Sequence, residues 1–283
     1  MKNIVFNYKH IKAMHILENN KLKYEYIGNY SEEELFSVGC IFKAFLSALV
    51  GIAIKQGKII STDDKVTDYW LGAELSDSRW RYLTVGHVLS KTTGLCWPGP
   101  SERIPSDMAE VFKLQFSADP GAEFAYKPDP QIIVYLLERI YEKGIVEIMQ
   151  ENLICKLGND KWNWNRNRIE DMQLPIKTLD RFGELYLQCG KIDEFIIFEQ
   201  DYYADSIREY SNGGFPECLP YGYGWWVGTF NDVKYHMASG FGGQIVGVIP
   251  DRNTVVTILS EMDRPHPENK KIIEMIISEQ YNA

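Results

Sequence analysis

Strand-like segments stand at both ends of this 283-residue chain, and a long, mainly helical stretch separates them. Near the N-terminus, residues 11–28 predict a β-hairpin with a tight turn at Glu18-Asn19-Asn20. Near the C-terminus, residues 221–230 and 233–239 and the runs GQIVGVIP and TVVTILS are typical of strands. Strands from both ends can share one antiparallel sheet, with the middle of the chain as a helical insertion. The pattern therefore predicts an α+β fold.

Three segments of the middle stretch carry clear helical signals. Residues 41–55, IFKAFLSALVGIAIK, are dominated by apolar residues and alanine and predict a buried helix that ends near Gly57. The segment LTVGHVLSKTTGL predicts a short helix closed by Gly94. Residues 129–142 predict an amphipathic helix with Asp129 as its N-cap.

Helices are also expected at residues 175–190 and 268–280. Because no internal repeat or flexible linker divides the sequence, we expect one domain over residues 1–283. Within it, the sheet part is assigned to residues 1–60 and 221–283, and the mainly helical part to residues 61–220.

The composition argues against several classes of partner. The net charge is −9, whereas binding to a nucleic-acid backbone needs clustered Lys and Arg. The run WNWNRNR at 162–168 is short and isolated, so we expect no nucleic-acid partner. No apolar run approaches the length of a membrane span and no signal peptide is evident, which predicts a cytoplasmic protein without membrane contact. The sequence does not indicate an oligomeric state.

The spacing of cysteine and histidine argues against cross-links and cofactors. The five cysteines are odd in number and widely separated, and they form no C-x-x-C pair. This pattern indicates neither a disulfide framework nor a zinc site. The five histidines are also scattered, without an H-x-x-x-H pair. We therefore predict no metal and no cofactor.

The start of the buried helix carries a candidate catalytic pair. In FSVGCIFKAF, Cys40 stands three residues before Lys43, and positions three apart lie on one face of a helix. A helix N-terminus and a neighbouring ammonium both favour a thiolate, which needs less help from a base than a hydroxyl does. By position alone, however, Cys40 fits better as a small buried residue at a helix start. The surrounding sequence has to decide between the two interpretations.

Six segments follow one another in a recognisable order. They are FSVGCIFKAFLSALVGIAIKQGKIISTDDKVTDYW, LTVGHVLSKTTGL, PGAEFAYKPDPQIIVYLLERI, IKTLDRFGELYLQCGKI, YGYGWWVG and ASGFGGQIVGVIPDRNTVVTILS. Together they resemble the serine β-lactamase and penicillin-binding-protein superfamily, most closely its class C β-lactamase, D-alanyl-D-alanine carboxypeptidase and esterase branch. The match covers most of residues 10–260. It implies a β-lactamase/transpeptidase-like fold, with an antiparallel sheet flanked by helices and a mainly helical subdomain.

The resemblance implies catalytic roles for three residues. Cys40 occupies the nucleophile position, where the family has serine, and Lys43 matches the lysine of the S-x-x-K motif. Tyr126 matches the tyrosine of the Y-x-N motif, which helps to move a proton between nucleophile and leaving group. Here that motif reads Tyr126-Lys127-Pro128, and proline cannot donate the hydrogen bond of the missing amide. This departure argues against recognition of a β-lactam or a peptide amide in the family's usual way.

The third motif of the family, K-T-G or H-T-G on an edge strand, is also altered. Ala238-Ser239-Gly240 stands in its place, so Ser239 keeps the hydroxyl but the cation is missing. His236 substitutes for the cation only if the strand register slips. By resemblance, the backbone N–H groups of Cys40 and Phe241 form an oxyanion hole. Loss of the cation argues against a substrate carboxylate.

These assignments predict an acyl-transfer enzyme, either a hydrolase or a transacylase. Its partner would be a small-molecule ester, thioester or amide, held as an acyl-thioester on Cys40 in a pocket that Trp97 helps to line. Two alternatives stay open. Cys40 replaces a natural serine, which leaves a serine hydrolase or esterase; or the chain is a catalytically silent binding protein, an interpretation that fits the departures at Cys40, Pro128 and Ala238.

Overall fold

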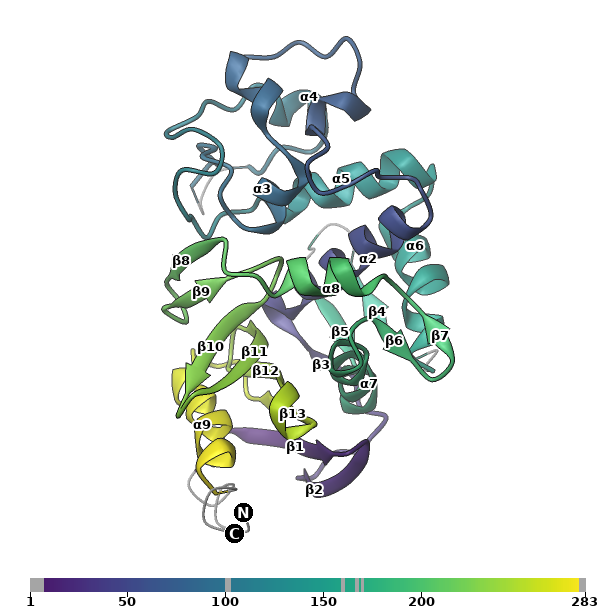
Figure 1. The fold of residues 1–283 in the computed structure, drawn as a ribbon, viewed down its shortest axis with the longest axis vertical. Coiled ribbons are helices and arrows are strands. Elements are labelled where there is room, and N and C mark those ends of the chain that lie inside the picture. Colours follow the sequence, from purple (N-terminus) through teal and green to yellow (C-terminus); the bar gives the residue numbers. More distant parts are fainter. Residues whose placement is uncertain (1–7, 100–102, 159–160, 166–167, 169–170, 280–283) are drawn as a thin grey trace.

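The computed structural model describes residues 8–99, 103–158, 161–165, 168 and 171–279. Its centre is an eight-stranded antiparallel sheet with the strand order β2-β1-β13-β12-β11-β10-β9-β8 (Figure 1). The strands are β1 (Ile11–Glu18), β2 (Lys21–Ile27), β8 (Ser211–Gly214), β9 (Leu219–Tyr221), β10 (Trp226–Phe230), β11 (Val233–Gly240), β12 (Gln244–Ile249) and β13 (Thr254–Ser260). Strands from both ends of the chain thus share one sheet, which confirms the predicted α+β architecture.

The predicted N-terminal hairpin is formed by β1 and β2. Asn19 and Asn20, between the two strands, have φ angles of 54° and 57°. Positive φ at both central residues defines the turn type whose twist matches that of the flanking strands. Asparagine tolerates this left-handed conformation better than most residues, which explains why it ends the first strand here.

Asn20→Ala is expected to lower the free energy of unfolding by about 1 kcal/mol, because alanine pays the steric penalty of a positive φ without local polar compensation. Thermal unfolding should detect this as a fall in Tm of about 2–4 °C. Asn20→Gly is the matched control and should keep or raise Tm, since glycine adopts this conformation freely. Equal Tm values for Asn20→Ala and Asn20→Gly would contradict the prediction.

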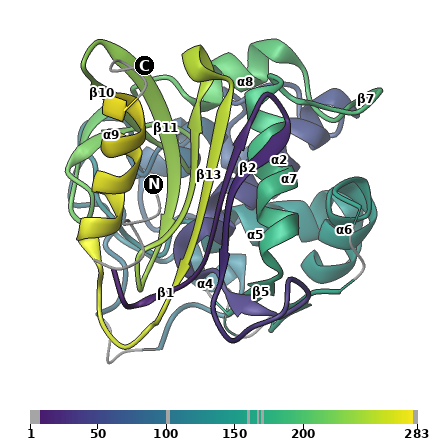
Figure 2. The ribbon, with the colours of Figure 1, turned by 90° about the horizontal axis from the view of Figure 1, so that it is seen from below.

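Helices cover both faces of the sheet (Figures 1 and 2). On one face, α9 (Lys270–Glu279) buries Ile272, Ile273, Ile276 and Ile277 in a core shared with the strands. On the other face lie α2 (Phe42–Lys55) and α7 (Ile176–Leu187). Gly183 of α7 sits directly against β13, where a Cβ atom would lie 2.4 Å from Val255 Cγ1. Absence of a side chain at this position is what lets the helix approach the sheet so closely.

The central helix α2 is buried along almost its whole length, from Phe42 to Ala53. A helix that is apolar all round belongs in a protein core, and the prediction of a buried helix is confirmed. It begins one residue later than predicted, because residues 39–41 form a 3₁₀ turn instead. It ends at Lys55, and Gly57 follows with a φ of 69°, so the predicted stop near this glycine is correct.

Shorter elements surround this frame. The remaining helices are α3 (Val85–Leu89), α4 (Met108–Val111), α5 (Pro130–Tyr141), α6 (Ile145–Asn152) and α8 (Gln200–Ser206), and the small sheets are built from β3 (Phe36–Ser37), β5 (Met172–Leu174) and β4 (Asn163–Trp164), and from β6 (Lys191–Ile192) and β7 (Phe195–Ile196). Within 61–220, α7 packs on the main sheet and β8 and β9 join it. Over the described residues, no helix combines the length and apolar character of a membrane span.

Several boundaries differ from the sequence-based expectation for local reasons. The short helix expected to close at Gly94 already ends at Leu89, and Lys91 turns the chain with a φ of 63°. Helix α9 starts at Lys270 because a 3₁₀ turn precedes it, while Gln280 lies outside the described residues. Within the run at 162–168, only Asn163 and Trp164 form a strand, and positions 166 and 167 lie outside the described residues.

The side chain of Asp129 does not cap α5 as predicted, and its actual position matters for the active site. It precedes α5, as predicted, but its carboxylate caps no backbone N–H of that helix. The side chain is instead fully buried and points into the protein. Pro130 at the first helical position has no N–H to satisfy, so α5 starts without a side-chain cap and leaves this carboxylate for tertiary contacts.

Candidate active site

The 3₁₀ turn before α2 places Cys40 against the end of β11. Gly39 has a φ of 52°, and a Cβ atom built on it would lie 3.0 Å from Phe241 N. A Cβ atom on Gly240 would lie 2.2 Å from Val38 O and 3.1 Å from Cys40 N. Both glycines are therefore needed for this close approach of two backbone segments. The approach gathers the N–H groups of Cys40 and Phe241, which the resemblance assigns to an oxyanion hole, in one small region.

Lys43 and Tyr126 meet beside this turn. The Nζ atom of Lys43 donates a hydrogen bond of 2.8 Å to the hydroxyl oxygen of Tyr126. Lys43 lies in the first turn of α2 and is only 8% exposed, while Tyr126 belongs to the segment that leads into α5. The ring of Tyr126 stacks on Trp226 of β10 with ring centroids 5.9 Å apart. The sequence prediction thus selected two residues that the fold brings together.

The pKa of Cys40 is lowered below that of an ordinary thiol. Burial of the sulfur is the largest influence and opposes ionisation, but positive charge and hydrogen bonding together outweigh it. The charge and hydrogen bond of Lys43 contribute most to this effect, followed by a hydrogen bond from Tyr126 and the charge of Lys91. The residue as a whole is partly exposed. This is the environment of a reactive cysteine.

Tyr126 stays protonated beside the thiolate. Burial raises its pKa well above the usual value, and the negative charge of ionised Cys40 raises it further. Tyr221 and Glu217 act in the same direction. The phenol therefore keeps its proton at neutral pH, which allows it to donate to the sulfur or to a leaving group while it accepts from Lys43.

Lys91 is a member of the site that the sequence analysis missed. It is 1% exposed, and its Nζ atom lies 5.1 Å from the centre of the Tyr126 ring. The ammonium donates to the carbonyl oxygen of Lys127 and lies 3.7 Å from Asp129 Oδ2. Burial lowers the pKa of Lys91 to about 7, although the charge of Asp129 opposes this shift. The sequence signal was the lysine of SKTTGL, which stands where the family segment LLxHTSGL has histidine.

The inward carboxylate of Asp129 explains the place of Trp97. Oδ1 of Asp129 accepts hydrogen bonds of 2.7 Å from both Trp97 Nε1 and Thr93 Oγ1. Among the described residues, Oδ2 has no hydrogen-bond partner, and it lies 3.7 Å from Lys91 Nζ. Trp97 is itself only 7% exposed. The structure therefore places Trp97 as a support for the Lys91–Asp129 pair, whereas the sequence analysis assigned it to the wall of an acyl pocket.

The altered third motif is divided between the site and the core. Gly240 and Phe241 lie at the Cys40 turn, and the Phe241 side chain is 49% exposed. Ser239 pairs with Ile245 in the β11–β12 ladder and is buried. His236 lies elsewhere, packed at the edge of the Trp225 ring, and burial lowers its pKa to about 3. It is a neutral core residue and does not take the place of the missing cation.

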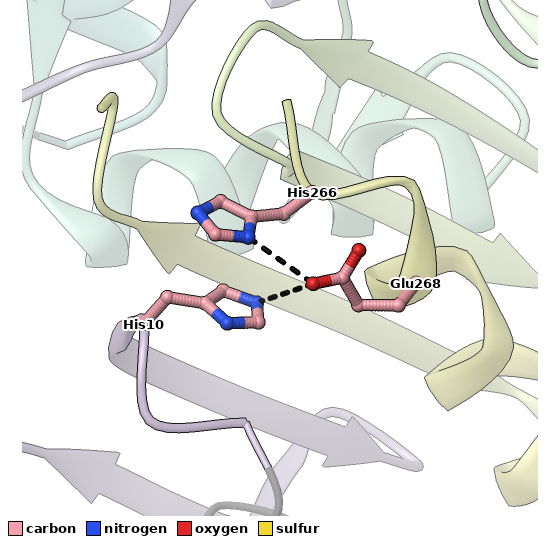
Figure 3. A group of neighbouring side chains, drawn as sticks. All are labelled: His10, His266 and Glu268. Atoms are coloured by element: carbon pink, nitrogen blue, oxygen red, sulfur yellow. Dashed lines mark hydrogen bonds and ion pairs between the residues drawn. The ribbon is translucent and has the colours of Figure 1, made fainter. Parts of the chain in front are cut away.

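One group of potential metal ligands occurs among the described residues. His10, His266 and Glu268 offer ligand atoms within 4.8 Å of one another (Figure 3). The two imidazole rings stack nearly in parallel with centroids 3.7 Å apart, and one nitrogen of each ring faces Glu268 Oε1, at 3.9 Å from His10 and 3.2 Å from His266 (Figure 3). His266 faces Glu268 at 3.2 Å and Asp263 at 3.1 Å, while His10 Nε2 lies 2.7 Å from Asn269 Oδ1. The group works as a hydrogen-bonded link between the start of β1 and the segment before α9.

Comparison with known proteins agrees with this geometry. Residues 12–278 match the family described as Beta-lactamase. No match was found among curated protein sequences.

Three solved structures are similar in fold. A candidate beta-lactamase from Bacteroides dorei DSM 17855 has a TM-score of 0.80 at 15% identity, over 92% of this chain and 88% of that one. A candidate 6-aminohexanoate-dimer hydrolase from Bacillus anthracis has a TM-score of 0.79 at 16% identity, over 98% and 80%. The octameric penicillin-binding protein homologue from Pyrococcus abyssi has a TM-score of 0.78 at 15% identity, over 97% and 75%. By the family match and this shared fold, the chain belongs to the beta-lactamase family.

Proposed function

We propose that the protein is an acyl-transfer enzyme of the class C-like branch that works through an acyl-thioester on Cys40. The observation that carries the proposal is the environment of Cys40, whose pKa is lowered by Lys43, Tyr126 and Lys91 even though burial opposes ionisation. A binding module has no need for a partly exposed cysteine whose thiolate is stabilised by a lysine and a tyrosine. Family membership supports a hydrolase or acyl-transfer reaction.

The proposed reaction proceeds in two halves. The sulfur of Cys40 bonds to the substrate carbonyl carbon, and the N–H groups of Cys40 and Phe241 receive the negative oxygen. The bond to the leaving group then breaks, Tyr126 gives that group a proton, and Lys43 returns one to Tyr126. Water or an amine attacks the thioester carbon, the sulfur leaves as a thiolate, and the attacking group's proton passes back through Tyr126 to Lys43.

The substrate class follows from what the site lacks. The cation of the third motif is replaced by Ala238, which is buried, and Pro128 replaces the amide of the second motif. Both changes disfavour a β-lactam with its carboxylate and favour a neutral ester, thioester or amide of a small metabolite. The 6-aminohexanoate-dimer hydrolase among the similar folds is named for a small-molecule substrate. A thioester intermediate also favours an amine acceptor over water.

The direct test is to incubate the protein with p-nitrophenyl butyrate and with a butyryl thioester of N-acetylcysteamine. We expect a burst of released leaving group and a butyryl mass increment located on Cys40 by peptide mass spectrometry. Cys40→Ala should lose both signals. Cys155→Ala, which removes an exposed thiol in the 3₁₀ turn after α6, should keep them. Equal leaving-group release by the Cys40→Ala variant would overturn the proposal.

Cys40→Ser tests the alternative of a natural serine at this position. A site adapted to sulfur should lose most of its acylation rate with serine, because a hydroxyl is far less ionised at neutral pH. Faster turnover by Cys40→Ser would identify a serine hydrolase or esterase whose nucleophile was replaced. Absence of an adduct with both residues and both probes would favour the silent binding protein.

A further inference from the structure

Lys91 and Asp129 form a buried charge pair behind Tyr126. Lys91 is 1% exposed and Asp129 is 0% exposed, and their charged atoms lie 3.7 Å apart. Burial of two charges is unfavourable unless other groups hold them. Here Thr93 and Trp97 both donate to Asp129 Oδ1, and the carbonyl of Lys127 accepts from Lys91. Two donors thus hold Asp129 and one acceptor holds Lys91. Packing alone does not explain this arrangement.

The pair faces the catalytic groups from a separate element. Lys91 follows α3, whereas Cys40 and Lys43 belong to the turn and first residues of α2. The ring of Tyr126 is near both lysines, with its centre 4.3 Å from Lys43 Nζ and 5.1 Å from Lys91 Nζ. The charge of Lys43 lowers the pKa of Lys91 and so disfavours its ammonium. Ionised Cys40 acts in the opposite direction and favours the ammonium of Lys91.

The remaining charged neighbours do not reverse this balance. Tyr221 of β9 has a raised pKa through burial and through the charge of Cys40, so it stays neutral. Glu217 acts on Tyr126 and raises its pKa. Two lysines, Lys43 and Lys91, therefore act on the charge balance of one thiolate, Cys40, and Lys91 also pairs with one carboxylate, Asp129. Removing either cation leaves the thiolate of Cys40 with less compensation.

A buried amine cannot bind a substrate carboxylate that arrives from solvent. Ala238 has removed the cation that the third motif would present to substrate, and Lys91 is enclosed on another side of the site. We propose that Lys91, held by Asp129, is a positioning residue that stabilises ionised Cys40 through Tyr126 and Lys43, so that the second positive charge of this site serves the nucleophile instead of the substrate. The inference rests on the proposed function of Cys40.

The test measures how fast iodoacetamide alkylates each cysteine of the whole protein as a function of pH, with the sites resolved by mass spectrometry. Lys91→Met keeps an unbranched side chain but removes the charge. Loss of the Lys91 charge should raise the pH midpoint of Cys40 alkylation by about one unit, which slows alkylation at neutral pH about tenfold. The other cysteines serve as internal references.

Lys127→Met is the matched control. Lys127 is exposed and adjacent to Tyr126, and only its backbone carbonyl contacts Lys91. Removal of the Lys127 charge changes the net charge of the protein by the same amount as Lys91→Met. Because solvent screens the Lys127 charge, the pH midpoint of Cys40 alkylation should not move. Asp129→Asn is a second probe. It keeps an oxygen for Thr93 and Trp97 but removes the counter-charge of Lys91, so Lys91 loses its proton more readily and the Cys40 midpoint should again rise.

The outcomes separate this inference from the proposed function. A wild-type midpoint for Cys40 near that of a free thiol, about 8.5, would defeat the activated nucleophile itself. A low wild-type midpoint that Lys91→Met leaves unchanged would overturn the role of Lys91 alone. If Lys91→Met does not fold, Asp129→Asn decides, and an unchanged midpoint in that variant overturns the inference. An equal shift in Lys127→Met would also overturn it, because a general charge effect would then suffice.

Discussion

Lys43→Met is expected to slow the alkylation of Cys40 at pH 7 by about a hundredfold and to abolish measurable acyl transfer. Lys43 is the strongest of the groups that lower the pKa of Cys40, through both its charge and a hydrogen bond. An adjacent opposite charge typically moves a pKa by about 1–3 units, and two units correspond to the hundredfold change. Acyl transfer should suffer more, since Tyr126 also loses the hydrogen bond of 2.8 Å that returns its proton.

The sign of the pH effect makes this prediction specific. The ammonium of Lys43 stabilises only the ionised form of Cys40, so its removal moves the midpoint to higher pH. Alkylation by the variant should therefore recover as pH rises and approach the wild-type rate above about pH 9–10, where an ordinary thiol is ionised. Lys55→Met, at the exposed far end of the same helix, is the control and should alkylate as the wild type does. Wild-type reactivity at pH 7 in Lys43→Met would show that Cys40 needs no activation by this residue.

Gly240→Ala is expected to reduce acyl transfer by about 10²–10³-fold, the loss typical for removal of an oxyanion donor. A Cβ atom at this position would lie 2.2 Å from Val38 O and 3.1 Å from Cys40 N, contacts that only a backbone shift can relieve. The shift has to separate the end of β11 from the Cys40 turn. Because Phe241 follows Gly240 directly, its N–H group moves away from the N–H of Cys40.

The readouts for Gly240→Ala distinguish a damaged oxyanion hole from a damaged fold. Acylation by the butyryl probe should fall, while the pH midpoint of Cys40 alkylation stays low, because Lys43 and Tyr126 are on other segments. Gly144→Ala is the control, since a Cβ atom there meets nothing within 4 Å and its φ is −69°. A Gly240→Ala variant that folds and acylates at the wild-type rate would remove Phe241 from the proposed hole.

Much of the frame could be predicted because its signals are local and regular. The hairpin at 11–28, the buried helix α2 and the C-terminal strands have clear periodicity or turn residues, and all three were found. Strands β8 and β9 have the sequences SNGG and LPY, which contain no alternating pattern. Their extended form comes from pairing beside β10, and a single sequence carries no sign of that pairing.

The order and spacing of the motifs allowed part of the site to be predicted from the sequence. Cys40, Lys43 and Tyr126 stand in a recognisable order, and the fold brings Lys43 and Tyr126 into contact. Asp129 was misassigned because an acidic residue before Pro130 is a typical helix start, whereas tertiary donors claim its carboxylate. Lys91 was missed although it stands where the family segment LLxHTSGL has histidine, because the sequence does not show that this lysine is buried beside Asp129. Burial of charge is decided by contacts between distant segments.

The pairing of β1 with β13 has a consequence for how this polypeptide is made. His15 lies opposite Thr257, so the partner of the first long strand is synthesised long after it. Until then β1 has only β2 beside it, and its other edge of N–H and C=O groups is open to any extended chain. Contacts of such long sequence separation form slowly, because the loop between them must first be closed. Newly made chains should therefore depend on dilution or on chaperones until β13 emerges, and truncation before β13 should yield aggregates rather than a smaller folded protein.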